Sequence, residues 1–339
     1  MNGRIEQLKE YLKAEGLDAA LIFDEYNVRA FTGIECDNAC VVVPAKGETV
    51  FWTDFRYVPM VHRVAPDLTV KDIKNVKFAG RKIGYEPSMT HARFLGLQKK
   101  HPGVEFVDVE AKLKELRAVK TDEEIEKLRK AELLNDMIWA MAQEKFKPGM
   151  TERDMARVIQ LLMVEHGDGE AFATIVCVGK NAAECHHVPD DTVWNGKEPV
   201  LVDMGVKLDG VCSDMTRNIV PPRVSRLYRK IYKTVLEANM KAIKGLKPGM
   251  TGKALDKIAR DYIKAAGFGD CFGHSLGHGV GYQVHEAPMA SVKGKMKLRP
   301  GMLVTIEPGI YLEGNLGVRI EDLVLVTEKG CEVLSHSDK

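Results

Sequence analysis

A repeated five-residue motif constrains the fold of this chain more than any other feature. Residues 147–151 read Lys-Pro-Gly-Met-Thr, and residues 247–251 repeat them at a spacing of 100. Each copy follows a helical segment and precedes another, with threonine placed to cap the second helix. The same spacing relates Gly167 to Gly267, Gly169 to Gly269, Phe172 to Phe272 and Gly179 to Gly279. The register predicts two related halves, each helix–turn–helix–strand, packed about a pseudo-twofold axis, and such an interface often holds a site.

The length of 339 residues suggests two domains rather than one core. Thr121 followed by Glu124 is a capping-box pattern, and the apolar stripe behind it predicts a long helix up to about residue 146. We place the boundary before this helix, giving domains 1–118 and 119–339. The first domain alternates helix and strand patterns, which indicates a small α/β domain: helices at 4–14 and 56–64, and strands at 19–23, 40–43, 49–53, 82–85 and 104–107.

Composition excludes several classes of partner. The formal net charge is +1 and no dense Lys/Arg cluster occurs, which argues against nucleic acid. The N-terminal segment predicts an amphipathic helix rather than a signal peptide. No run approaches the roughly 18 apolar residues of a membrane span. Seven cysteines are scattered without paired spacing, as is typical of reduced thiols in the cytosol. We therefore expect a cytoplasmic protein that contacts neither nucleic acid nor membrane.

Two aspartates flank a predicted β-hairpin. Asp203 ends the apolar run Val-Leu-Val, and Asp214 follows Val-Cys-Ser on the far side of an Asp209-Gly210 turn signal. If the turn centres on 209–210, Asp214 pairs with Gly205 and lies diagonal to Asp203. If it centres one residue earlier, the two aspartates face each other. Both registers place the carboxylates on one face, roughly 5–8 Å apart between Cβ atoms, where a cation would relieve their repulsion.

A glycine-rich segment contains three histidines, His274, His278 and His285. The first two have the i, i+4 spacing of a zinc-binding helix. However, glycines at 273, 277, 279 and 281 would each cost a helix ~1 kcal/mol. We therefore predict extended backbone, with glycines that let the chain approach a neighbour closely.

Two glutamates, Glu307 and Glu321, lie in apolar strand-like runs. A lone buried carboxylate costs several kcal/mol unless it is protonated or paired; Arg319, on the same strand face, could pair with Glu321. Together with the two aspartates and a histidine, these acids predict a metal site. The oxygen-rich donor set favours Mn, Co, Fe or Zn, and its size favours two divalent ions roughly 3.5–4 Å apart.

These residues resemble the pita-bread metallopeptidases, which include prolidase, aminopeptidase P, methionine aminopeptidase and the metal-free creatinase. The order Asp, Asp, His, Glu, Glu is theirs, with His278 in Gly-His-Gly, Glu307 in Ile-Glu-Pro-Gly and Glu321 in Arg-Ile-Glu-Asp. The resemblance covers nearly the whole chain. It implies an α+β fold in which a creatinase/prolidase-like N-terminal α/β domain precedes a pseudo-twofold pita-bread catalytic domain. Methionine aminopeptidases generally lack the N-terminal domain, so the Xaa-Pro branch is the better match.

The resemblance also implies a role for each metal ligand. Asp203 and Glu307 would each serve mainly one ion, with His278 on the Glu307 ion. Asp214 and Glu321 would bridge the two ions. Glu307 would also shuttle the proton of the attacking water.

Further residues are implied to contact the substrate. His285 would lie near the scissile carbonyl and stabilise the oxyanion. His186 matches the substrate-side histidine of the other half, with the adjacent His187 as an alternative. His274 would lie toward the proline side. Tyr311 and Arg319 would contact the substrate or the metal ligands.

The expected activity is hydrolysis of the bond between an N-terminal residue and proline in short proline-containing peptides. The residues leave open whether the enzyme is a dipeptidase or an aminopeptidase. A non-catalytic peptide-binding module and a creatinase-like hydrolase are alternatives, although the five ligand positions are intact. The resemblance implies a homodimer.

Overall fold

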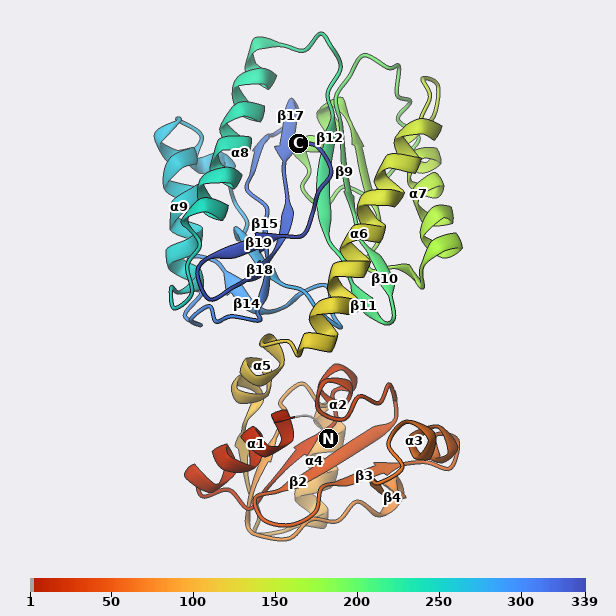
Figure 1. Ribbon diagram of the computed structural model, residues 1–339, viewed down its shortest axis with the longest axis vertical. Coiled ribbons are helices and arrows are strands. Elements are labelled where there is room, and N and C mark those ends of the chain that lie inside the picture. Colours follow the sequence, from red (N-terminus) through yellow and green to blue (C-terminus); the bar gives the residue numbers. More distant parts are fainter. Residues whose placement is uncertain (1–2) are drawn as a thin grey trace. The chain divides into compact units, whose positions relative to one another are not determined.

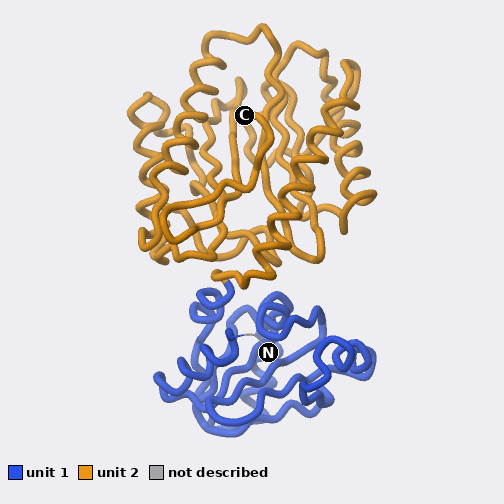
Figure 2. Tube along the Cα trace, in the orientation of Figure 1, with its two compact units in different colours: residues 1–117 blue, residues 118–339 orange. Residues whose placement is uncertain are grey.

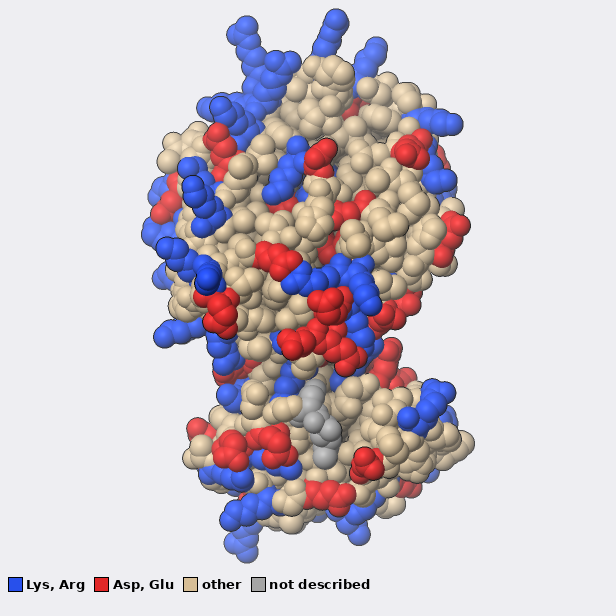
Figure 3. Space-filling model, in the orientation of Figure 1, with Lys and Arg blue, Asp and Glu red and all other residues tan. Residues whose placement is uncertain are grey.

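The computed structural model describes residues 3–339, and the chain divides into two compact units, residues 1–117 and 118–339 (Figure 2). On the face drawn in Figure 3, acidic and basic side chains are interspersed over most of each unit. Among residues 3–339, no helix combines the length and the apolar character that crossing a bilayer requires.

The first unit is built on a six-stranded sheet with the strand order β4-β3-β2-β1-β5-β6. Strand β2 pairs antiparallel with β1 and β3, and the other pairings are parallel. The central β1 is buried along its whole length, as its sequence Ala-Ala-Leu-Ile predicts. The strands are β1 (Ala19–Ile22), β2 (Ala39–Pro44), β3 (Val50–Thr53), β4 (Thr69–Asp72), β5 (Lys82–Tyr85) and β6 (Glu105–Asp108).

Three helices and a 3-10 turn connect these strands: α2 (Glu25–Thr32), α3 (Val58–Val64), α4 (His91–Lys100) and η1 (Ile73–Asn75). Helix α1 (Gly3–Ala14) precedes β1, and α5 (Glu110–Ala118) follows β6. The apolar stripe of α1 is fully buried, as expected. Helix α3 begins two residues later than its sequence pattern predicts. The reason is Asp54, whose carboxylate accepts hydrogen bonds from the backbone N–H and the guanidinium of Arg56 and fixes a turn there.

In the second unit, two pairs of helices flank the strands (Figure 1). The pairs are α6 (Asp122–Lys145) with α7 (Glu152–His166), and α8 (Arg226–Gly245) with α9 (Gly252–Ala265). The predicted capping box of α6 is present: the Glu124 N–H donates to Thr121 Oγ1 at 3.2 Å, and the Thr121 N–H donates to Glu124 Oε2 at 2.9 Å. The α+β fold class is confirmed.

The strands between the helix pairs form small antiparallel sheets, ordered β11-β10-β7, β12-β9-β8, β13-β14, β15-β18-β19 and β16-β17. Strands β9 and β12 of the first half contact β17 of the second. The first half contains β7 (Gly169–Glu170), β8 (Ile175–Val178), η2 (Gly179–Ala183), β9 (Val200–Met204), β10 (Val206–Leu208), β11 (Val211–Cys212) and β12 (Met215–Ile219). The second contains η3 (Gly269–Cys271), β13 (Gly277–Gly279), β14 (Glu286–Ala290), β15 (Leu303–Ile306), β16 (Gly309–Leu312), β17 (Leu316–Arg319), β18 (Asp322–Val326) and β19 (Cys331–Val333).

The sequence repeat is a repeat of structure. Gly149 and Gly249 both have positive φ, and Thr151 and Thr251 cap α7 and α9. Each turn is closed by a later segment in the same way. The Gly149 N–H donates to Trp194 O at 2.8 Å, and the Gly249 N–H donates to Leu298 O at 2.7 Å. The halves therefore share a backbone plan.

Close backbone approach explains a glycine in the histidine-rich segment. This segment is extended, as predicted, with β13 pairing with β14 and also contacting β15. A Cβ atom added at Gly277 would lie 1.9 Å from the carbonyl oxygen of Thr305. Only glycine allows His278 to lie this close to β15.

We expect Gly277→Ala to lower the free energy of unfolding by about 1–3 kcal/mol, because the added methyl group must push β13 away from β15. Gly273→Ala is the matched control, since nothing lies within 4 Å of a Cβ at that position, and it should stay within ~0.5 kcal/mol of wild type. Urea denaturation of the metal-free proteins measures both. Equal stability of the two variants would contradict the close-approach argument.

Candidate metal centre

The two aspartates lie on one hairpin face. Strand β9 pairs with β12 so that Asp203 is opposite Thr216, and continuing this register places Asp214 opposite Gly205. At the hairpin tip Asp209 and Gly210 have φ of 51° and 69°, as a type I′ turn requires. The first of the two predicted registers is therefore correct, and Asp214 is diagonal to Asp203.

The second half supplies the other predicted ligands. His278 lies on β13, where its backbone N–H donates to Thr305 Oγ1 at 3.1 Å. Glu307 follows β15, and Glu321 lies between β17 and β18. The Thr216 hydroxyl, from the first half, donates to Glu321 Oε2 at 2.7 Å. Side chains from both halves thus meet at one place.

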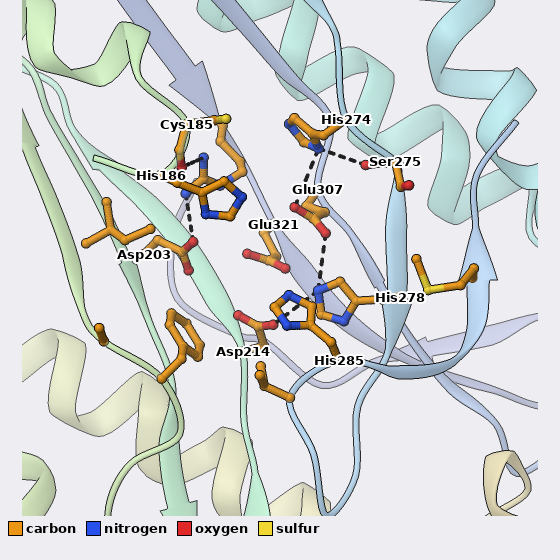
Figure 4. Close-up of a pocket in the computed structure, with 16 residues that line it drawn as sticks. Cys185, His186, Asp203, Asp214, His274, Ser275, His278, His285, Glu307 and Glu321 are labelled. Carbon is orange, nitrogen blue, oxygen red and sulfur yellow. Dashed lines mark hydrogen bonds and ion pairs between the residues drawn. The ribbon is translucent and has the colours of Figure 1, made fainter. Parts of the chain in front are cut away.

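The five predicted ligands converge on a common cavity (Figure 4). His278 Nε2 lies 3.6 Å from Asp214 Oδ2 and 3.4 Å from Glu307 Oε1. One donor atom from each of Asp214, His278 and Glu321 lies within 4.8 Å of the others. These three side chains are almost completely buried. The spacing fits a metal ion held between the donors.

The buried acids of the cluster repel one another, and a cation between them would reduce this repulsion. Burial, together with the neighbouring acids, raises the pKa of Asp214 and Glu321 well above the ordinary range. Burial likewise raises the pKa of Glu307 to about 8, and it lowers that of His278 to about 4. Asp203 Oδ1 is buried without a hydrogen-bond partner among residues 3–339. Carboxylate oxygens and a neutral imidazole are the donors that divalent Mn, Co, Fe or Zn accept.

Arg319 supplies one positive charge at the edge of this cluster. It donates from Nη2 to Asp203 Oδ2 at 2.7 Å rather than forming the considered pair with Glu321. Its Nη1 donates to Tyr311 Oη at 2.9 Å, and His274 Nε2 lies 2.9 Å from the same oxygen. Arg319 and His274 line the cavity, whereas Tyr311 lies behind them. Tyr311 thus connects two residues of the wall.

The cavity has a volume of about 410 Å³ and is lined by further histidines. The ring of His285 lies 4.2 Å from that of His278 between centroids. Of the two adjacent histidines, His186 faces the cavity while His187 is buried elsewhere. Apolar residues complete the wall, and sequence reasoning had assigned them no role: Phe172, Ala173, Ile175, Val284 and Met289.

Sequence reasoning also missed Glu132, a fully buried acid on α6. It accepts a hydrogen bond from the Asp214 N–H at 3.1 Å and another from Ser335 Oγ at 2.6 Å. Burial raises its pKa to about 8. The available signal was its position four residues after Leu128, on the apolar stripe of the helix. Glu132 fixes the backbone that carries Asp214.

A pseudo-twofold fold with buried carboxylates converging on one cavity defines a metallohydrolase, and the comparisons identify its family. The profile of metallopeptidase family M24 matches residues 126–328, and that of the creatinase/prolidase N-terminal domain matches residues 4–119. The chain belongs to metallopeptidase family M24, in its pita-bread prolidase group. The resemblance seen in the sequence is confirmed.

The chain is similar to relatives over its whole length. The Xaa-Pro dipeptidase of Pyrococcus furiosus is 35% identical, with 100% of this chain and 99% of the relative covered. The structure of an Xaa-Pro dipeptidase from Bacillus anthracis superimposes with a TM-score of 0.92 at 33% identity, covering 99% and 98%. The structure of an X-Pro aminopeptidase from Thermotoga maritima gives 0.88 at 30%, covering 99% and 98%.

We expect the metal-free protein to release protons when it binds Mn²⁺. The pKa of Glu307 is raised to about 8, so its carboxyl group is mostly protonated at pH 7, and the pKa values of Asp214 and Glu321 are raised in the same direction. A metal ion must displace the protons, and its apparent affinity should therefore rise as the pH increases toward 8. Isothermal titration at pH 7 in two buffers of different ionisation enthalpy measures the release. Identical heats in both buffers would disprove it.

Proposed function

We propose that this protein is a two-metal Xaa-Pro peptidase that hydrolyses the bond between an N-terminal residue and proline. One observation carries the proposal. The acids Asp203, Asp214, Glu307 and Glu321 and the imidazole of His278 line one cavity in a chain of this family. The printed names of similar proteins, Xaa-Pro dipeptidase and X-Pro aminopeptidase, support the choice of substrate.

The donors divide naturally between two divalent ions of Mn, Co, Fe or Zn. His278 and Glu307, 3.4 Å apart, would hold one ion. Asp203 would hold the second, and its unpartnered Oδ1 supports this assignment. Asp214 and Glu321 line the same cavity and would contribute oxygens to both ions. When bound, such ions lower the pKa of a coordinated water and polarise a carbonyl.

The remaining residues bind the peptide and move its proton. The Glu307 carboxylate would take the proton of the attacking water and pass it to the leaving proline nitrogen. His285 and His186 would donate hydrogen bonds to the peptide oxygens near the scissile bond. Arg319 holds the Asp203 carboxylate in place through its 2.7 Å ion pair, and His274, tied to Tyr311, would contact the proline side.

We also propose that the protein is cytoplasmic and that it acts on short peptides. A homodimer is proposed from the family resemblance. All seven cysteines lie within residues 3–339 as free thiols, which supports a reducing compartment. A cavity of about 410 Å³ suits a small ligand. Sedimentation of the purified protein at the mass of the monomer would refute the dimer.

We expect Asp214→Ala to lower kcat/KM for Xaa-Pro by more than about 100-fold. The reason is that mutation of a residue that only hydrogen-bonds to a metal ligand typically lowers metal affinity or activity by about 10–100-fold, and Asp214 is proposed as a ligand itself. Metal content by mass spectrometry should fall below two ions. Asp191→Ala, which removes an exposed aspartate paired with Arg153, should match wild type. Full activity in Asp214→Ala, or in wild type after exhaustive chelation, would refute the proposal; a protein that binds peptide without hydrolysing it would support the binding-module alternative.

We expect cleavage only where proline is the second residue. Purified enzyme with added Mn²⁺ should hydrolyse Ala-Pro. The matched dipeptide Ala-Ala should react far more slowly, because the nitrogen of its peptide bond carries a hydrogen and is not part of a proline ring. Assay of Ala-Pro beside Ala-Pro-Ala-Ala distinguishes a dipeptidase from an aminopeptidase. Similar rates for Ala-Pro and Ala-Ala would rule out an Xaa-Pro peptidase, and turnover of creatine alone would favour the creatinase-like alternative.

A further inference from the structure

The loop at residues 178–190 carries His186 to the cavity. It leaves β8 at Val178, passes through η2, and presents Cys185 and His186 at the wall of the site (Figure 4). Within residues 3–339, no hydrogen bond from another residue holds the His186 ring. The position of that ring therefore depends on the backbone of the loop, where Arg319 Nη1 also donates to Cys185 O at 3.3 Å. We call residues 178–190 the His186 loop.

One buried carboxylate holds both ends of the His186 loop. Glu152 is the first residue of α7 and is completely buried. Its Oε1 accepts hydrogen bonds from the Val178 N–H at 2.6 Å and from Asn181 Nδ2 at 2.9 Å. Its Oε2 accepts from the Asp190 N–H at 3.0 Å and lies 2.7 Å from His187 Nε2. Four points of the loop are thus tied to a single side chain.

The neighbour of His186 completes this arrangement. The buried His187 ring lies between Glu152 and Glu184, with Nδ1 3.0 Å from Glu184 Oε2. Burial lowers the pKa of His187, but its hydrogen bonds with the two carboxylates outweigh that effect and leave the pKa raised. When the ring is protonated, it donates from both nitrogens, one to each carboxylate. The N-terminus of α7 also favours the negative charge of Glu152.

The spacing of this cluster resembles a metal site, but its atoms are already engaged. Donor atoms of Glu152, His187 and Asp190 lie within 4.8 Å of one another. Each oxygen of Glu152 has two hydrogen-bond partners, and Asp190 Oδ1 accepts from the Thr192 N–H at 2.7 Å. The cluster is complete as a hydrogen-bonded clamp without an ion.

The second half of the molecule shows that the shared fold does not require this clamp. Position 252, the equivalent of 152, is glycine. The backbone contacts are the same, since the Glu152 N–H donates to Thr192 O and the Gly252 N–H to Met296 O, both at 3.1 Å. A Cβ at Gly252 would lie 1.9 Å from Met289 O. Of the two equivalent positions, only residue 152 therefore carries an acid, in the half whose following loop carries His186. The buried acid of the second half, Asp256, lies four residues further along its helix and accepts from the Leu276 N–H at 3.1 Å.

We propose that Glu152, together with His187, is a positioning residue that holds the His186 loop so that His186 faces the substrate. This inference rests on the proposed function only for the role of His186; the clamp itself is testable without substrate.

The decisive variant is Glu152→Gln. A glutamine amide keeps one acceptor oxygen, but in either orientation its NH₂ group faces at least one backbone N–H, of Val178 or of Asp190, that it cannot accept from. Amide hydrogen exchange at Val178 or Asp190 should become faster by on the order of tenfold or more. For Ala-Pro, kcat/KM should fall by on the order of 10- to 100-fold through a displaced His186, largely in KM, with metal content unchanged.

Asp154→Asn is the matched control. It removes a carboxylate from the same helix turn, where Asp154 completes the cap with Thr151 and pairs with Arg157 on the exposed side of the helix but does not contact the His186 loop. Exchange in the loop and KM should stay at wild-type values. His187→Gln keeps one hydrogen bond to Glu152 and should give an intermediate KM. If Glu152→Gln does not fold, His187→Gln provides the same comparison.

The outcomes separate the two proposals. If wild type cleaves no Xaa-Pro peptide, the proposed function fails, while faster exchange in Glu152→Gln still supports the clamp. If wild type is active and the loop exchanges at the wild-type rate in Glu152→Gln and His187→Gln, the clamp is overturned. Faster exchange with unchanged KM overturns the positioning of His186.

Discussion

Mutual repulsion between buried carboxylates is the constraint on which the second unit depends. Burial raises the pKa of Asp214, Glu307 and Glu321, and Arg319 offers a single compensating charge, which it directs to Asp203. Such a cluster would be expelled from an ordinary core. Strands of both halves hold these acids in place, and a bound cation, as proposed, would offset their repulsion. The capped helices, the type I′ hairpin and the close approach of β13 to β15 all serve to fix the positions of these acids.

The two halves share a backbone plan but contribute different chemistry. The first half provides two aspartates from one hairpin and His186 from a long loop; the second provides His278 and two glutamates. The repeated turns have the same hydrogen bonds, so the difference lies in side chains placed on equivalent backbone. Glu152 and Gly252 are the sharpest example. An acid at one turn organises a loop, whereas at the other turn the space is taken by backbone.

Much of the fold and of the candidate metal site could be predicted from the sequence, because acids within apolar strand-like runs can be recognised in the sequence itself. The α6 capping box, the extended glycine-rich segment and the pseudo-twofold repeat were all readable. The hairpin register was not, since both registers keep the aspartates on one face and only the positive φ of Asp209 and Gly210 selects one. Helix α4 is not predicted from the sequence, because it buries only Leu97 and therefore has no apolar stripe. The apolar stripe of α6 could have pointed to Glu132, but the partners of Glu132 and the contact of His187 with Glu152 join distant segments, which no local pattern encodes.

The proposed metal ligands come from both halves of the second unit, so metal binding would also affect the stability of the fold. Because Asp203 and Asp214 belong to one half and His278, Glu307 and Glu321 to the other, ions held by these five residues as proposed would cross-link the two halves. By linkage, metal bound there would raise the free energy of unfolding of the second unit, and removal of the metal would lower it. Cellular metal supply would therefore govern how long the protein survives proteolysis as well as how fast it works.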